Sequence, residues 1–289
     1  MRARRRARAE LTGRPPGATL AAVRAPEDGT APGGRRIVPN GFGVPEALAG
    51  LAAGFVLATL FVSALGALSG HPGRTSGVGS DVASLAGLWC GLAGAAVVAS
   101  RRARSLVPAA SQPSPGLGLT GMLASDYGLS IRPWPDVPLG IAVGLVSQYA
   151  LVPLFELPLL PFVPHLFQRL GQPAVSLTSD ARGAGLVLLG VLVCLGSPLV
   201  EELYFRGLLL RGLAGRLAPL GSRIGPVLAV GISGVVFGLV HFEALQLLAL
   251  VGFGAVLGTL AWRTGRLGPG VVAHIAFNTA AFVSVARAH

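Results

Sequence analysis

Two adjacent glutamates at the end of an apolar run are the residues in this sequence best suited to chemistry. The stretch 197–206 reads SPLVEELYFR. A side-chain charge near the centre of a bilayer costs roughly 2.5 to 3.5 kcal/mol on insertion scales, so charged residues there are usually paired and functional. On a helix, Glu202 and Arg206 stand four residues apart on one face, whereas Glu201 is rotated by about 100°. The spacing predicts that Arg206 holds Glu202 and that Glu201 is free for acid or base chemistry.

Two further polar pairs lie downstream, each inside an apolar segment. Phe237 and His241 form the first pair, and His274 and Asn278 form the second. Each pair has four-residue spacing, which puts both side chains on one helical face. Taken singly, His241 could be a histidine at the end of a span, and His274 with Asn278 could be a hydrogen bond between helices. Together, however, the three spans carry an acid, two imidazoles and an amide. Independent packing roles explain this full set less well than they explain each pair.

In this order, Glu-Glu-x-x-x-Arg, Phe-x-x-x-His and His-x-x-x-Asn resemble the three motifs of the CPBP family of intramembrane glutamic endopeptidases. That family includes the CAAX prenyl proteases and the bacteriocin-processing or self-immunity proteins. The resemblance extends over roughly residues 126–286, and no motif position departs from the pattern. It implies that Glu201 activates water with the help of His241, and that His274 and Asn278 stabilise the oxyanion. It also implies structural support from Glu202, Arg206 and Phe237, and neither a cofactor nor a metal.

Three other functions use the same residues. Two histidines and a glutamate are legitimate zinc ligands, so a zinc-dependent membrane protease stays open, although the sequence has no H-E-x-x-H and the resemblance favours metal-free hydrolysis. A non-catalytic scaffold or a bacteriocin self-immunity protein would use the fold without the chemistry. A proton-coupled transporter would use the acids as a relay.

The composition is that of a membrane protein. Mean hydropathy is +0.67 and charged residues make up 12% of the chain, against about 25% in an ordinary soluble domain. The net charge of +11 does not indicate nucleic acid, because the arginines gather in a tail and in loops beside apolar spans, as the positive-inside rule describes.

The expected partners are the lipid bilayer and a membrane-associated protein or peptide substrate. Cys90 and Cys194 lie in apolar spans and are expected to be small buried hydrophobes.

The predicted fold is an all-α, polytopic transmembrane bundle of about seven spans with the catalytic core in the last four. A span needs about 20 apolar residues. The predicted spans are 47–68, 82–100, 138–162, 184–205, 226–242, 244–262 and 268–286. The predicted parts are a disordered Arg-rich cytoplasmic tail over 1–45, a two-helix N-terminal membrane appendage over 46–104, a cytoplasmic loop over 105–136 and the protease-like core over 137–289. The arginines predict a cell-membrane protein with its N-terminus inside and its C-terminus outside.

The site residues are expected to converge on a polar cavity that opens to the cytoplasmic side. One geometric difficulty stands in the way, because a straight helix from Pro226 carries His241 more than about 20 Å along its axis. We therefore expect that helix to tilt, to start late, or to bend at a glycine. Glu156 matches no motif and is expected to be structural, whereas Gln148 and Tyr149 could line a cavity.

Overall fold

The structure, a computed structural model, describes residues 43–70, 77–106 and 118–286. All three ranges lie within one compact unit, residues 34–289. Every regular element in them is a helix, which confirms the all-α fold class. The Arg-rich tail predicted over 1–45 lies outside the described residues, except for its last three.

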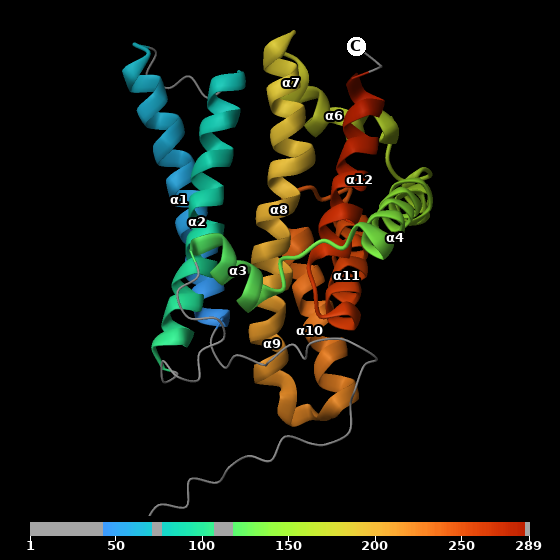
Figure 1. The fold of residues 1–289 in the computed structure, drawn as a ribbon. Coiled ribbons are helices and arrows are strands. Elements are labelled where there is room, and N and C mark those ends of the chain that lie inside the picture. The colour runs from blue at the N-terminus through green and yellow to red at the C-terminus, as the bar shows by residue number, and fades with distance from the viewer. Residues whose placement is uncertain (1–42, 71–76, 107–117, 287–289) are drawn as a thin grey trace, which may run out of the picture. The chain divides into compact units, whose positions relative to one another are not determined.

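Ten longer α-helices and several shorter helical pieces make up the described chain (Figure 1). The longer α-helices are α1 (Val44–Leu68), α2 (Val78–Ser105), α3 (Leu119–Tyr127), α4 (Pro133–Val146), α6 (Leu166–Thr178), α7 (Ala184–Val191), α9 (Leu210–Leu217), α10 (Gly221–Leu239), α11 (Leu247–Thr264) and α12 (Gly268–Ala286). The other pieces are η2 (Ser147–Leu151), α5 (Val152–Glu156), η3 (Leu157–Leu159), η4 (Leu192–Gly196), α8 (Ser197–Glu201), η5 (Glu202–Leu209) and η6 (Ala218–Leu220). Of these, η2, η4 and η5 are π-helical, and η3 and η6 are 3₁₀ turns.

Six helical runs are long and apolar enough to cross a membrane, and the protein is a multi-pass membrane protein. The longest run, 184–239, contains the turn η6 and folds back on itself there (Figure 1). It therefore supplies two of the predicted segments, so the described chain has about seven. The connection between these two is only Ala218–Leu220, much shorter than the predicted 206–225, because the helix continues past Arg206 to Leu217.

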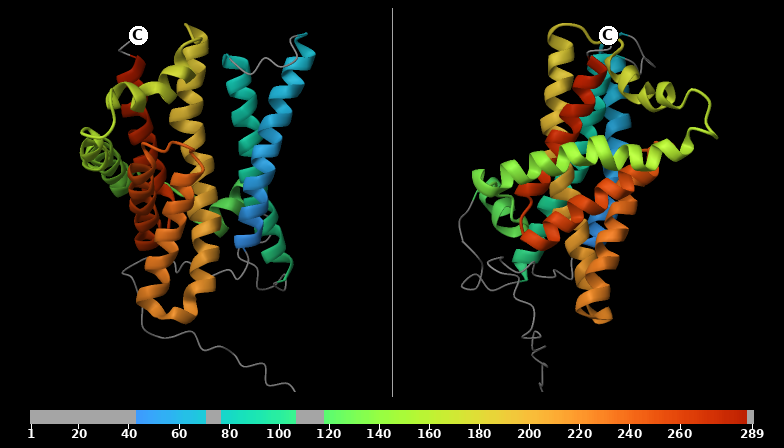
Figure 2. Two further views of the ribbon diagram at one scale, coloured as in Figure 1. Left: turned by 180° about the vertical axis from the view of Figure 1, so that it is seen from behind. Right: turned by 90° about the vertical axis from the view of Figure 1, so that its right-hand side faces the viewer.

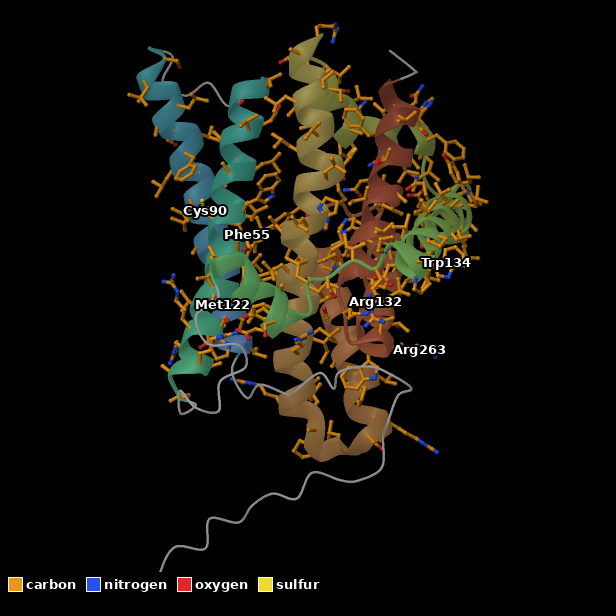
Figure 3. The ribbon with its side chains drawn as sticks, in the orientation of Figure 1. Phe55, Cys90, Met122, Arg132, Trp134 and Arg263 are labelled. Atoms are coloured by element: carbon orange, nitrogen blue, oxygen red, sulfur yellow. The ribbon has the colours of Figure 1, made fainter. Side chains whose placement is uncertain are left out.

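The surface of these helices is apolar, as expected where lipid is the solvent. Leu60 on α1 is 56% exposed and Val227 on α10 is 71% exposed. Cys90 on α2 is also exposed (Figure 3), so the expectation that both cysteines are buried in the protein is wrong for this residue. The sequence could not distinguish burial against lipid from burial against other helices, because both environments favour the same apolar residues.

The continuous run α4–η2–α5 is strongly inclined to the other helices and crosses them almost horizontally (Figure 2, right). It packs on α12 through two glycines, Gly140 and Gly144, one helical turn apart. An added Cβ at Gly140 would lie 2.6 Å from Val272 Cβ, so only glycine permits this approach.

The first two helices pack on each other through small residues. A Cβ at Gly50 of α1 would lie 3.0 Å from the carbonyl oxygen of Gly91 on α2, and Gly54 also faces Gly91. Small residues at four-residue spacing therefore let these two helices approach closely.

The segment predicted as a cytoplasmic loop over 105–136 contains α3, and α4 begins at Pro133. Three side chains clamp α3 in place. Arg211 Nη1 and Nη2 donate to the carbonyl oxygens of Asp126 and Tyr127 at 2.5 and 2.7 Å. Arg104 pairs with the Asp126 carboxylate at 2.7 Å. The Tyr127 hydroxyl donates to Ala96 O at 2.7 Å, and burial raises the pKa of this hydroxyl well above its usual range.

The N-terminal hairpin, predicted as an appendage, is bonded to the helix that carries the glutamates. Tyr204 on η5 donates its hydroxyl to Ala47 O on α1 at 2.6 Å, and both residues are buried. The ring of Trp89 on α2 covers Gly196, where a Cβ would overlap it. The hairpin therefore contacts the site helix at one residue before the glutamate pair in the sequence and at one residue after it.

The position of α10 resolves the geometric difficulty with His241. This helix starts at Gly221, directly after the turn η6, and that turn lies beyond the near ends of α11 and α12 (Figure 1). The helix starts before Pro226, so the expected late start is wrong, and it ends at Leu239, so that His241 falls in the following turn with its ring against that of Phe237. The α6 helix was not predicted. It follows the inclined α4–α5 run, and Gln246 Nε2 in the α10–α11 loop donates to its Leu170 O at 2.9 Å.

Candidate active site

The glutamate pair lies where the helix changes its hydrogen-bond pattern. Glu201 is the last residue of α8, and Glu202 is the first residue of the π-helical η5. A second π-helical turn, η4, precedes Pro198. Proline lacks an N–H and disturbs the turn before it, and π-bulges occur frequently at functional sites. The local sequence therefore produces an irregular helix around the two acids.

Glu202 and Arg206 form the predicted ion pair. Arg206 Nη1 lies 2.8 Å from Glu202 Oε1, and both side chains have 0% exposure. Arg206 Nη2 also donates to Gly254 O on α11 at 3.1 Å. The guanidinium carbon stands 4.5 Å from the centroid of the Phe237 ring on α10. This single arginine therefore joins three helices around the site.

His274 on α12 lies between the two carboxylates. Its Nδ1 is 3.1 Å from Glu202 Oε1, and its Nε2 is 3.8 Å from Glu201 Oε2. The predicted bond from Arg206 is present, and Glu202 Oε1 is also in contact with His274, which was not predicted. The two acids differ in access, because the side chain of Glu201 is 15% exposed and that of Glu202 is 0% exposed.

Both glutamates keep one buried oxygen that has no hydrogen-bond partner among the described residues, the Oε2 atom in each case. Glycine makes the approach of α12 to Glu202 possible. A Cβ at Gly270 would lie 2.9 Å from Glu202 Oε2. The sequence offered no motif signal for Gly270, since its role depends on a neighbouring helix.

Phe237 stands between the two imidazoles. Its ring centroid is 4.6 Å from that of His241 and 5.7 Å from that of His274, and the side chain is 1% exposed. His241 Nδ1 is 2.6 Å from Phe237 O. A carbonyl oxygen can only accept, so Nδ1 carries the hydrogen, and Nε2 of the neutral ring keeps its lone pair. The Phe-x-x-x-His spacing thus orients the histidine as well as placing it.

Asn278 lies one turn after His274 but contacts a different part of the site helix. Its Nδ2 donates to Val193 O on η4 at 3.0 Å. The structure therefore places Asn278 at the turn before Glu201, and it places Glu201, Glu202, Arg206 and His274 together.

Three residues outside the motifs complete the site. Phe253 on α11 is 0% exposed, lies 5.4 Å from His274 between ring centroids, and stacks on Phe277 at 3.9 Å. Gly254 on α11 supplies the carbonyl to which Arg206 donates. Ser233 on α10 donates to Phe205 O at 3.2 Å. Phe253 and Ser233 lacked any sequence signal, because a buried aromatic or serine in an apolar helix is common.

Tyr149 of the inclined run faces a space that the motif residues do not line. Tyr149 is 64% exposed and lines an open cavity of about 540 Å³ between α4 and α12. None of the motif residues lines this cavity, so it is not the polar cavity expected around the site. That polar cavity stays a prediction. Gln148 has a buried Oε1 without a hydrogen-bond partner in the described part of the chain. Within the described ranges, no three His, Cys, Asp or Glu side chains are arranged to hold a metal ion.

Comparison with known proteins gives one match. Residues 183–280 match the family model described as type II CAAX prenyl endopeptidase, Rce1-like. This range contains Glu201, His241, His274 and Asn278. Comparison with curated proteins and with solved structures found no significant match. The family match confirms the resemblance indicated by the three motifs, over residues 183–280.

Proposed function

We propose that this membrane protein is an intramembrane, metal-independent glutamate-type endopeptidase. It would hydrolyse peptide bonds in a membrane-associated protein or peptide, as the family match indicates for a membrane endopeptidase. The observation that carries the proposal is the placement of His274 between one carboxylate that Arg206 neutralises and a second one, Glu201, that keeps an unpartnered oxygen.

The geometry of the cluster supports a role for His274 as a donor. Its Nδ1 lies 3.1 Å from Glu202 Oε1 and its Nε2 lies 3.8 Å from Glu201 Oε2, so a hydrogen on Nε2 would stand next to Glu201. That hydrogen is available to a developing oxyanion at the reacting carbonyl.

In the proposed reaction, Glu201 accepts a proton from water while the water oxygen attacks the peptide carbonyl carbon. His241 assists through Nε2, the nitrogen that its bond to Phe237 O leaves with a lone pair. His274 and the second amide hydrogen of Asn278 stabilise the oxyanion. When the C–N bond breaks, the carboxylic acid of Glu201 returns the proton to the leaving amine. Glu202, Arg206 and Phe237 hold these groups in position.

The helix arrangement supports the proposed orientation in the cell membrane. Arg132 and Arg263 lie toward the end of the helices that carries the α9–α10 turn (Figure 3), and Arg216 and Arg223 flank that turn. This end would face the cytoplasm, with the N-terminus on the same side and the end of α12 outside.

A comparison of peptide termini tests the proposal and finds the substrates at the same time. Membranes from cells that produce the wild-type protein or Glu201→Gln are compared for new peptide termini by mass spectrometry. The proposal predicts termini that occur with the wild type and are absent with the variant. Identical termini in both samples would leave the scaffold or immunity function as the better account. Loss of purified activity with a chelator and recovery with zinc would replace the metal-free mechanism by the zinc-dependent one.

A further inference from the structure

One backbone carbonyl in the site helix lacks the donor that the register of its turn would supply. In the π-helical turn η4, the N–H of Ser197 donates to Leu192 O, five residues back. The next N–H in this register belongs to residue 198 and would reach Val193 O. Residue 198 is proline, which has no N–H. The π-helical register therefore leaves the Val193 carbonyl without a donor from its own helix.

The missing donor comes from another helix. Asn278 Nδ2 on α12 donates to Val193 O at 3.0 Å. In a membrane interior there is no bulk water to satisfy such a carbonyl, so an internal partner is needed. The same helix carries His274 one turn earlier, and α12 packs directly on η4. The bond therefore connects the helix of His274 to the turn that precedes Glu201.

We propose that Pro198 and Asn278 act together to position Glu201, an inference that rests on the proposed peptidase function. Pro198 leaves the Val193 carbonyl without a backbone donor, and the Asn278 amide donates to this carbonyl instead. This bond fixes the π-helical register of the turn before the glutamates. The register determines the direction of Glu201, because one residue of slip rotates a helical side chain by about 100°. Asn278 is in this respect a positioning residue, in addition to its proposed contact with the oxyanion through its other amide hydrogen.

A double-mutant cycle separates the two contributions of Asn278. Pro198→Ala restores an N–H that can reach Val193 O, so the amide of Asn278 is then no longer the necessary donor. Turnover is measured for the wild type, Pro198→Ala, Asn278→Ala and the double variant. We expect Asn278→Ala to lower kcat by about 100-fold with little change in KM. In the Pro198→Ala background the loss should be smaller by about tenfold, a coupling typical of residues in contact, and the double variant should exceed Asn278→Ala in turnover. An equal loss in both backgrounds would overturn the inference.

Hydrogen exchange tests the same pair without any activity. In purified Asn278→Ala, the amides of residues 195–203 should exchange faster than in the wild type. Ser284→Ala is the matched control, since it removes a side-chain hydrogen bond on α12 that goes only to Ala280 O of the same helix. Unchanged exchange in Asn278→Ala would contradict the positioning role, even if Pro198→Ala fails to fold. A protein that cleaves no peptide but shows the faster exchange would refute the proposed function and keep the Pro198–Asn278 pair.

Discussion

At the scale of single residues, the two neighbouring glutamates differ because their surroundings differ. Glu202 is fully buried and shares one oxygen between Arg206 and His274. Glu201 is partly exposed, and its contact with His274 is the longer one, at 3.8 Å. Glu202 is therefore occupied by two partners, whereas Glu201 is the acid that a water or substrate can reach.

Gly270 gives a residue-scale prediction with a matched control. Alanine at this position would push a methyl group against Glu202 Oε2, 2.9 Å away, and displace the pair that orients His274. We expect Gly270→Ala to lower both the melting temperature and turnover. Gly231→Ala on α10 meets no atom within 4 Å, so it should raise stability by about 0.5 to 1 kcal/mol, the usual gain from replacing glycine in a helix. Equal effects of the two variants would show that α12 does not approach Glu202 this closely.

At the scale of helices, the site helix is held from several sides. Tyr204 bonds α1, Arg211 bonds the end of α3, and Asn278 bonds α12. These contacts join segments far apart in the sequence. They stabilise a helix whose backbone hydrogen bonding is interrupted by proline and by two π-helical turns.

Tyr204→Phe tests whether the N-terminal hairpin supports the site. The variant removes only the hydroxyl that donates to Ala47 O at 2.6 Å. Loss of a buried hydrogen bond should lower the unfolding free energy by about 0.5 to 1.5 kcal/mol, and it should lower turnover because Tyr204 follows Glu202 closely in η5. Thermal unfolding and kinetics are compared with Tyr149→Phe, whose hydroxyl is on an exposed side chain. A Tyr204→Phe protein as stable and active as that control would show that the hairpin is a separate appendage.

The sequence predicted the elements better than their contacts. Motif spacing correctly indicated the Glu202–Arg206 pair, and apolar length indicated the spans. It could not show that His274 reaches Glu202, because α12 is apolar on nearly every face and its sequence does not indicate which face meets the bundle. Helix α3 is short and bounded by Gly118 and Gly128, and α6 contains Pro173, so both were hidden among residues typical of loops.

At the scale of the whole molecule, the long helical run sets the sidedness. The run from Ala184 to Leu217 contains 34 residues by its bounds, and at 1.5 Å per residue it is roughly 50 Å long, more than the hydrocarbon thickness of about 30 Å. Its two ends must therefore emerge on opposite sides of the membrane. The arginines near the α9–α10 turn favour that end as the inner one.

Cysteine labelling in intact cells tests this orientation. Ser222→Cys lies in an exposed position just after the turn η6, and Ser179→Cys lies in an exposed position after α6. A membrane-impermeant maleimide should label Ser179→Cys in intact cells and Ser222→Cys only after the membrane is opened. The wild type provides the background from Cys90 and Cys194. Labelling of Ser222→Cys in intact cells would reverse the proposed topology.

The central claim is that Glu201 transfers the proton in peptide hydrolysis, and the turnover of purified Glu201→Gln tests it most directly. Glutamine keeps the size of the side chain but cannot accept the proton, so kcat should fall by at least about 100-fold, the lower end of a general-base contribution. Glu156→Gln is the control, because Glu156 is another membrane acid outside the motifs. The account predicts wild-type turnover for Glu156→Gln and loss for Glu201→Gln in a folded protein; turnover of Glu201→Gln equal to that of the wild type would contradict it.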